Sequence, residues 1–138
     1  MPTAATTTYT ETGLMPVYNP VGARQHNVAL SDGTYAAGTV LGELTATPGT
    51  FAAYADAAVD GTGVAKGFLQ YAVVVASGII TMGTAAGGGP WGETRKHTPV
   101  YFSGAFRTVD LTGFDAAALA DLNGHLVNGT VADGIVEF

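Results

Sequence analysis

The sequence predicts a mainly β fold: a small, compact β-barrel or β-tulip-like body with one short helix at about residues 115–123, and an extended N-terminal arm. The chain contains 20 glycines in 138 residues, and many of them stand in turn motifs. Short apolar runs rich in β-branched and aromatic residues lie between these turns, which is typical of strands. Only one segment combines helix caps with an apolar stripe at helical spacing. The first residues show neither a helical nor a strand period, so they predict an arm rather than a packed element.

We assign residues 1–27 to a flexible arm and to the loop that leads into the body. Five of the first ten residues are threonine, and the first charge is Glu11. Three prolines in this segment disfavour both helix and central strand. Threonine and tyrosine favour extended backbone, so we expect residues 6–12 to form an edge strand when a partner is present. Fully stretched, the first 17 residues span roughly 56 Å at about 3.3 Å each.

Residues 28–138 form the β-rich body in this prediction. Glycine, proline and aspartate mark its turns, and apolar runs mark its strands. We expect first a turn at Asp32–Gly33, then a hairpin of strands at 38–46 and 51–55 around Pro48–Gly49, and a loop at 56–63. One long apolar strand at 64–76, bent at Gly67, and an excursion loop at 77–92 come next. The chain then forms a hairpin of 98–104 with 105–111, the helix, and a closing strand within 129–138 after an Asp133–Gly134 turn.

The predicted helix has recognisable signals at both ends. Asp115 suits the N-cap, and Phe114 with Leu119 fits a hydrophobic staple across the first turn. Leu119 and Leu122 supply an apolar stripe, and Gly124 suits the position after the C-cap. We therefore expect a helix from Asp115 to about residue 123.

Composition restricts the classes of partner. Charged residues make up 12% of the chain, about half the usual share, so a monomer would expose much apolar and small-residue surface. We therefore expect an oligomer. A net charge of −6 with five basic residues argues against a nucleic-acid partner, because phosphate binding needs clustered Lys and Arg. The longest apolar run, 71–82, is interrupted by Ser77–Gly78 and is short of the ~20 residues of a membrane helix. We expect no membrane partner.

We predict no catalytic, cofactor or metal site, and no enzyme activity. Asp56 and Asp60 precede Gly61 somewhat as in a calcium loop, but the alternating oxygen ligands and final glutamate are missing, so a turn explains them. The run at 87–89 lacks the Lys-Ser/Thr of a phosphate-binding loop. The three histidines lack the spacing of paired metal ligands, which favours isolated surface or interface positions; they are His26, His97 and His125.

Two segments carry a family resemblance. YADAAVDGTGVAKGFLQYAVVVA (54–76) joins an aromatic strand, an Asp-Gly-Thr turn and a glycine-containing apolar strand. TPVYFSGAFRTVDLTGF (98–114) contains Ser-Gly-Ala-Phe-Arg and precedes the helix and a closing apolar strand. With GTVLGEL (38–44) ahead of them, these segments resemble, in order, the lambda-like head decoration proteins of tailed bacteriophages. The excursion at 77–92 has no clear counterpart in that family, and the arm is long.

The resemblance implies a capsid-stabilising protein without catalysis or cofactor. It implies a homotrimer on the outer surface of the virion head, at three-fold positions of the expanded capsid. It also implies that the arm becomes ordered on the major capsid protein, where we expect it to add a strand to an exposed sheet edge. The residues assigned to this contact are Thr6, Thr8, Tyr9 and Thr10 as the added strand, with Leu14, Met15, Pro16, Val17 and Tyr18 as apolar anchors.

Two other readings remain open. One is a different phage structural or adhesion module that binds carbohydrate, with Trp91, Tyr101 and the acidic loops lining the site. The other is a small hydrolase that uses His97 with Asp110. The sequence leaves open the host, the residues of the trimer interface, the register of the arm on the capsid, the role of the glycine-rich loop 77–92, and any second binding role of the exposed face.

Overall fold

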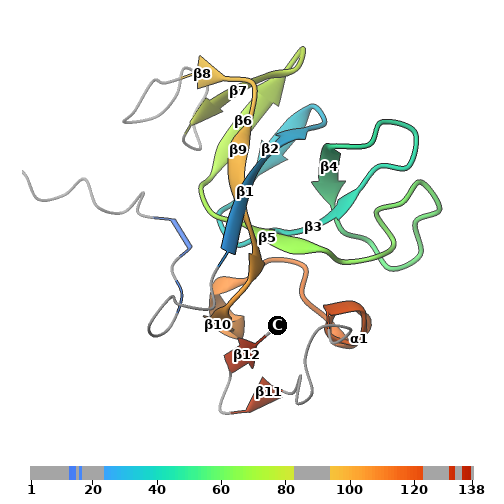
Figure 1. Cartoon of the computed structure of the whole chain (residues 1–138), viewed down its shortest axis with the longest axis vertical. Coiled ribbons are helices and arrows are strands. Elements are labelled where there is room, and N and C mark those ends of the chain that lie inside the picture. Colours follow the sequence, from blue (N-terminus) through green and yellow to red (C-terminus); the bar gives the residue numbers. More distant parts are fainter. Residues whose placement is uncertain are drawn as a thin grey trace, which may run out of the picture.

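The computed structural model describes residues 13–14, 16, 24–82, 94–122, 131–132 and 135–137, and these form a mainly β fold with one short α-helix (Figure 1). The predicted fold class is confirmed. Its elements are β1 (Arg24–Leu30), β2 (Gly33–Tyr35), β3 (Val40–Glu43), β4 (Thr50–Ala53), β5 (Gly67–Leu69), β6 (Val73–Ala76), β7 (Ile79–Met82), β8 (Thr94–Arg95), β9 (Thr98–Ser103), β10 (Ala105–Arg107), α1 (Ala116–Leu122), β11 (Val131–Ala132) and β12 (Ile135–Glu137).

The centre of the fold is a closed barrel of five strands in the order β1-β4-β3-β5-β9. The pairing of β1 with β4 is parallel, and the other four pairings are antiparallel. The predicted hairpin around Pro48–Gly49 is confirmed as β3 and β4. Closure gives every barrel strand a hydrogen-bonded neighbour on both sides.

Two smaller sheets extend the barrel. A four-stranded sheet has the order β2-β6-β7-β8, and a three-stranded sheet has the order β10-β12-β11. Figure 1 shows the first sheet at the top of the view, and the second with α1 at the bottom. The predicted closing strand after the turn at 133–134 is confirmed as β12, which pairs with β11 and β10.

The segment 64–76 was predicted as one long strand, and this is wrong. It contains two strands, β5 in the barrel and β6 in the four-stranded sheet, separated by residues 70–72. Both strands are mostly buried, so their apolar composition is continuous although the chain changes sheets between them. Hydrophobicity reports burial and does not report which sheet a strand joins.

The excursion loop predicted at 77–92 is also corrected. Residues 79–82 form β7, which pairs with β6 through the two-residue turn Ser77–Gly78. Both turn residues have positive φ, 51° and 79°, as a type I′ hairpin turn requires. The carboxylate of Asp32 accepts hydrogen bonds from both backbone amides of this turn, each at 3.1 Å. The rest of the predicted loop, 83–92, lies outside the described residues.

The predicted hairpin of 98–104 with 105–111 is wrong in its pairing. β9 pairs with β1 and β5 in the barrel, whereas β10 pairs with β12 in the three-stranded sheet. Gly104, between them, has φ +137°, a backbone conformation that favours glycine. Residues 108–110 form a 3₁₀ helix rather than a strand.

The core divides into two clusters of buried side chains. The first lies between the barrel, β10 and α1, and includes Leu14, Phe68, Phe106 and Leu122. The second joins the barrel to the four-stranded sheet and includes residues of β1, β3, β6 and β7. α1 therefore closes one region of the core.

Helix α1 begins as the sequence predicted. An oxygen of Asp115 accepts a hydrogen bond from the backbone amide of Ala118 at 2.8 Å, so Asp115 acts as the N-cap. The hydroxyl of Tyr54 donates to the same carboxylate at 3.1 Å. Farther along the helix, Asp121 accepts from the backbone amide of Ala65 at 2.9 Å. The contacts of Asp115 with Tyr54 and of Asp121 with Ala65 attach α1 to the segments that follow barrel strand β4 and precede barrel strand β5. Gly124, the predicted C-terminal signal, lies outside the described residues.

Strand β1 begins at Arg24, four residues before the boundary assigned to the body. Residues 24–27 are exposed although they pair with β9, so they carry no apolar signal. No helix in the described part of the chain is both long enough and apolar enough to span a bilayer.

Candidate interaction surfaces

The chain is fixed to its own body at Gly13–Leu14. Leu14 is 3% exposed and belongs to the core cluster that contains Phe68 and Phe106. Its backbone amide donates to the carbonyl of Gln70 at 2.6 Å. Gly13 has φ +88°, and a Cβ there would lie 2.6 Å from the same carbonyl oxygen. Only glycine fits this conformation and this approach. We call Gly13–Leu14 the arm root.

The arm root corrects one predicted capsid contact. Leu14 was assigned to the apolar anchors on the capsid, but it is buried in the core of its own chain and presents almost no surface to a partner. Pro16 is partly buried. The other predicted arm residues, Thr6, Thr8, Tyr9, Thr10, Met15, Val17 and Tyr18, lie outside the described residues.

The loop 55–64 is closely packed and carries an exposed apolar tip. Gly61 has φ +106°, and a Cβ there would lie 2.3 Å from the carbonyl oxygen of Glu43. Asp60 accepts hydrogen bonds from the amide and the hydroxyl of Thr62, at 3.0 and 2.6 Å, and these contacts lower the pKa of Asp60. The carboxylate thus serves the turn, as predicted. Val59, at the tip of the loop, is 99% exposed.

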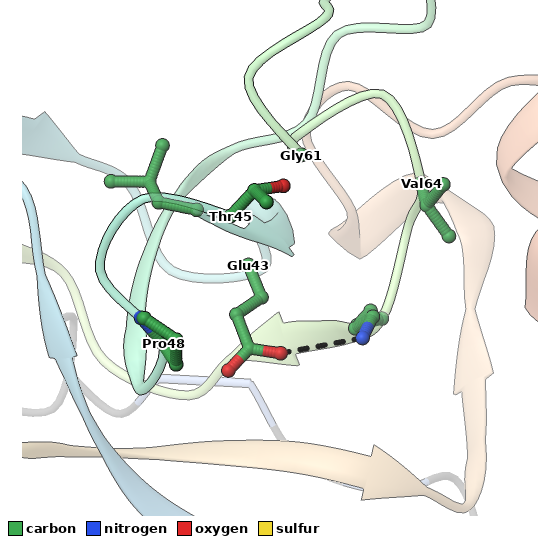
Figure 2. A pocket seen from close by; sticks show the side chains of 7 residues that line it. Glu43, Thr45, Pro48, Gly61 and Val64 are labelled. Atoms are coloured by element: carbon green, nitrogen blue, oxygen red, sulfur yellow. Dashed lines mark hydrogen bonds and ion pairs between the residues drawn. The ribbon is translucent and has the colours of Figure 1, made fainter.

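A first pocket of about 470 Å³ lies beside this loop. A Glu43 carboxylate oxygen lies 3.3 Å from the Lys66 ammonium group. Figure 2 shows the Glu43 side chain at this pocket, with a dashed line for the ion pair. The other carboxylate oxygen accepts from the backbone amide of Gly49 at 2.8 Å. The Gly49 contact, and after it the Lys66 contact, lower the pKa of Glu43. Glu43 and Lys66 are therefore paired with each other at this pocket. It is lined by Glu43, Leu44, Thr45, Pro48, Gly61, Val64 and Lys66.

A second pocket, of about 450 Å³, lies between the barrel and α1. The ring of His26 on β1 meets the ring of Phe102 on β9 edge to face, with centroids 5.6 Å apart. The rest of the lining comes from α1 and from the segment before β5. This pocket combines aromatic, apolar and charged side chains; its lining is His26, Val64, Ala65, Lys66, Phe102, Asp121 and Leu122. The sequence analysis missed it, because the residues come from four separate segments and His26 gave the only signal.

The residues singled out for other chemistry are not brought together. His97 and Asp110 are both exposed, and no hydrogen bond or ion pair joins them in the described part of the chain. His125 and Trp91 lie outside that part. Tyr101 was predicted to line a carbohydrate site, but it is 5% exposed and packs against Phe106 with ring centroids 4.8 Å apart. Among the described residues, no group of three or more His, Cys, Asp or Glu could hold a metal ion.

Comparison with known proteins gives no assignment. No protein-family model matches the chain, and neither a curated protein nor a solved structure is significantly similar to it. The family resemblance therefore stays a prediction from the sequence segments.

Proposed function

We propose that this protein is a capsid decoration protein, which binds as a homotrimer at three-fold positions of an expanded phage head and holds neighbouring capsid subunits together. Packaged DNA pushes the shell outward, and a trimer that spans several subunits resists their separation because its own contacts must break as well. The proposal rests on the resemblance of segments 38–44, 54–76 and 98–114 to head decoration proteins. No catalytic step or cofactor is part of it.

The arm root is the structural observation that best supports this proposal. Strand addition to a capsid subunit needs an extended segment of this chain that can reach that subunit. Twelve residues precede Gly13, and extended they span roughly 40 Å at about 3.3 Å each. The root fixes the point on the body from which this segment starts. We assign residues 1–12 to strand addition on the major capsid protein, with Thr6, Thr8, Tyr9 and Thr10 in the added strand.

Binding through three arms explains how a weak single contact suffices. Ordering a segment on binding costs about 2–5 kcal/mol of the gross interaction energy. Linking three such segments in one trimer raises apparent affinity by about 10²–10⁴ when all three sites can be reached together. Expansion of the head sets the spacing of those sites, so a trimer prefers the expanded shell.

The test is a truncation that stops before the arm root. Removal of residues 2–12 leaves Gly13 and Leu14 in place, whereas a longer deletion would also remove a core side chain. Full-length and truncated proteins are mixed with expanded, decoration-free heads of the phage that encodes the chain, and occupancy per three-fold site is measured by cryo-electron microscopy. We expect the truncated protein to remain a folded trimer by sedimentation and to leave the heads uncoated. Undiminished coating would refute the role of the arm, and a monomer in both proteins would refute the trimer.

A further inference from the structure

The second pocket lies beside a β-bulge whose extra residue contributes to its lining. On β1, Arg24 and Gln25 are consecutive, but their partners on β9 are Ser103 and Tyr101. Phe102 is therefore the extra residue of the bulge. Bulges interrupt the alternation of a strand and redirect a side chain, and they are common next to functional sites.

Both faces of β9 are covered. Val100 belongs to the core cluster that joins the barrel to the four-stranded sheet and Tyr101 to the cluster that contains α1, so these consecutive residues face opposite sides and are both buried. Phe102 is partly exposed and lines the pocket, with His26 against it. Gly67 on β5 leaves the space that this arrangement needs, because a Cβ there would lie 2.6 Å from the Tyr101 carbonyl oxygen and 3.4 Å from the Phe102 ring.

The polar groups of the pocket come from α1, from the segment before β5 and from β1. Asp121 uses one carboxylate oxygen, Oδ2, to accept from the Ala65 amide, and this bond fixes the side chain at the pocket. Its Oδ1 has no hydrogen-bond partner among the described residues and is available to accept from a ligand. Lys66 donates to Glu43 at 3.3 Å, which uses one of its three donor positions. His26 is exposed and adds a ring nitrogen.

We propose that this pocket binds a neutral pyranose sugar. A pyranose ring has C–H groups on its faces and hydroxyl groups around its rim, so it needs an aromatic or apolar wall together with both acceptors and donors. Phe102 and Val64 supply the wall, Asp121 the acceptor, and Lys66 and His26 the donors. The volume of about 450 Å³ lies within the range of about 300–1,000 Å³ that is usual for small-molecule sites.

The charges favour an uncharged ligand. An anionic sugar would lie against Asp121 in a chain of net charge −6, and a cationic ligand would lie against Lys66. A neutral polyol uses both groups without placing a like charge beside either of them. This inference does not depend on the capsid proposal, because sugar binding is measured on the isolated protein.

The test is an NMR titration of the ¹⁵N-labelled full chain with glucose, galactose, mannose and N-acetylglucosamine, and with glucuronic acid and arginine as charged probes. We expect at least one neutral sugar to move the amide signals of Ala65, Lys66 and Phe102 in a saturable manner at millimolar concentrations. Loss of the charged acceptor in Asp121→Asn should weaken this binding roughly tenfold or more, while its amide oxygen can still hold Ala65. Phe102→Leu keeps an apolar side chain but removes the ring, and should weaken binding as well.

The matched control is Asp110→Asn, which changes the same chemical group at an exposed position that does not line the pocket. Its affinity should equal that of the unmodified protein. The proposal is overturned if no neutral sugar gives saturable shifts, if only a charged probe binds, or if Asp121→Asn and Phe102→Leu bind as well as the control. ¹⁵N spectra of each variant show whether it is folded, and the two substitutions test lining residues from two different elements, α1 and β9.

Discussion

Replacing Leu14 by alanine is expected to lower the free energy of unfolding by about 3 kcal/mol. Leu14 is 3% exposed, and its cluster contains Phe68 and Phe106, both of which are 0% exposed. Removing a buried leucine costs about 2–5 kcal/mol, with the larger values where the neighbours cannot close the cavity. Side chains enclosed on all sides have little room to move, so we place the loss near the middle of this range. Small domains are stable by about 5–15 kcal/mol in total, so the change is large.

Urea denaturation followed by circular dichroism measures this loss as a lower midpoint. The control is Val59→Ala, which makes a smaller truncation of an apolar side chain at a position that is 99% exposed. Its stability should change by no more than about 0.5 kcal/mol. If Leu14→Ala were no more destabilising than Val59→Ala, the arm root would not be packed in the core. A capsid anchor would behave differently, since its loss would weaken head binding and leave stability unchanged.

Three other predictions concern the body. Burial, and after it the Asp115 hydrogen bond, raises the pKa of Tyr54 to about 12. The stability that this phenol contributes is therefore present below pH 10 and is lost as the pH rises from 10 toward 12. Tyr54→Phe should remove that part of the pH dependence of the unfolding free energy, measured by denaturation from pH 9 to 12. Ser77→Asn places the residue favoured in type I′ turns at a positive φ and should raise stability by about 0.5 kcal/mol, whereas a lower thermal midpoint would contradict the turn assignment. Because the pKa of Glu43 is lowered in the folded protein, its contribution to stability is present above pH 4.5 and is lost as the pH falls through the folded-state pKa. The stability of Glu43→Gln should therefore differ from that of the unmodified protein at pH 7 and converge with it in acid. An equal stability difference at pH 7 and pH 3 would contradict this linkage.

Local signals in the sequence predicted the local structure well. The β3–β4 hairpin and the cap of α1 each depend on residues only a few positions apart, such as Pro48–Gly49 and Asp115. The errors concern partner choice. β9 and β10 follow each other in sequence but pair in different sheets, and this choice is made by strands distant in the chain. The turn Ser77–Gly78 was present in the sequence, but the apolar residues on both sides were read as one interrupted run.

The candidate sites were less accessible from the sequence. A leucine in a threonine-rich arm is compatible with a contact to a partner or to the chain's own core, and the structure shows Leu14 buried with Phe68 and Phe106. The pocket at Phe102 lies beside a bulge, where the register between β1 and β9 shifts by one residue. The alternating pattern of apolar residues cannot show such a shift in advance, because the extra residue has no fixed composition.

The closure of the barrel by β1 and β9 has a consequence for how the chain reaches its folded state. Gln25 and Tyr101 are partners, although 76 positions separate them (101 − 25). During synthesis on the ribosome, β1 emerges long before β9, so the ring cannot be completed until most of the chain has been translated. Contacts between distant positions also slow folding, because the intervening loop must be ordered first. The nascent chain therefore carries an unfinished sheet with open edges for much of its synthesis, and open edges of this kind are sites where another chain can pair until β9 arrives.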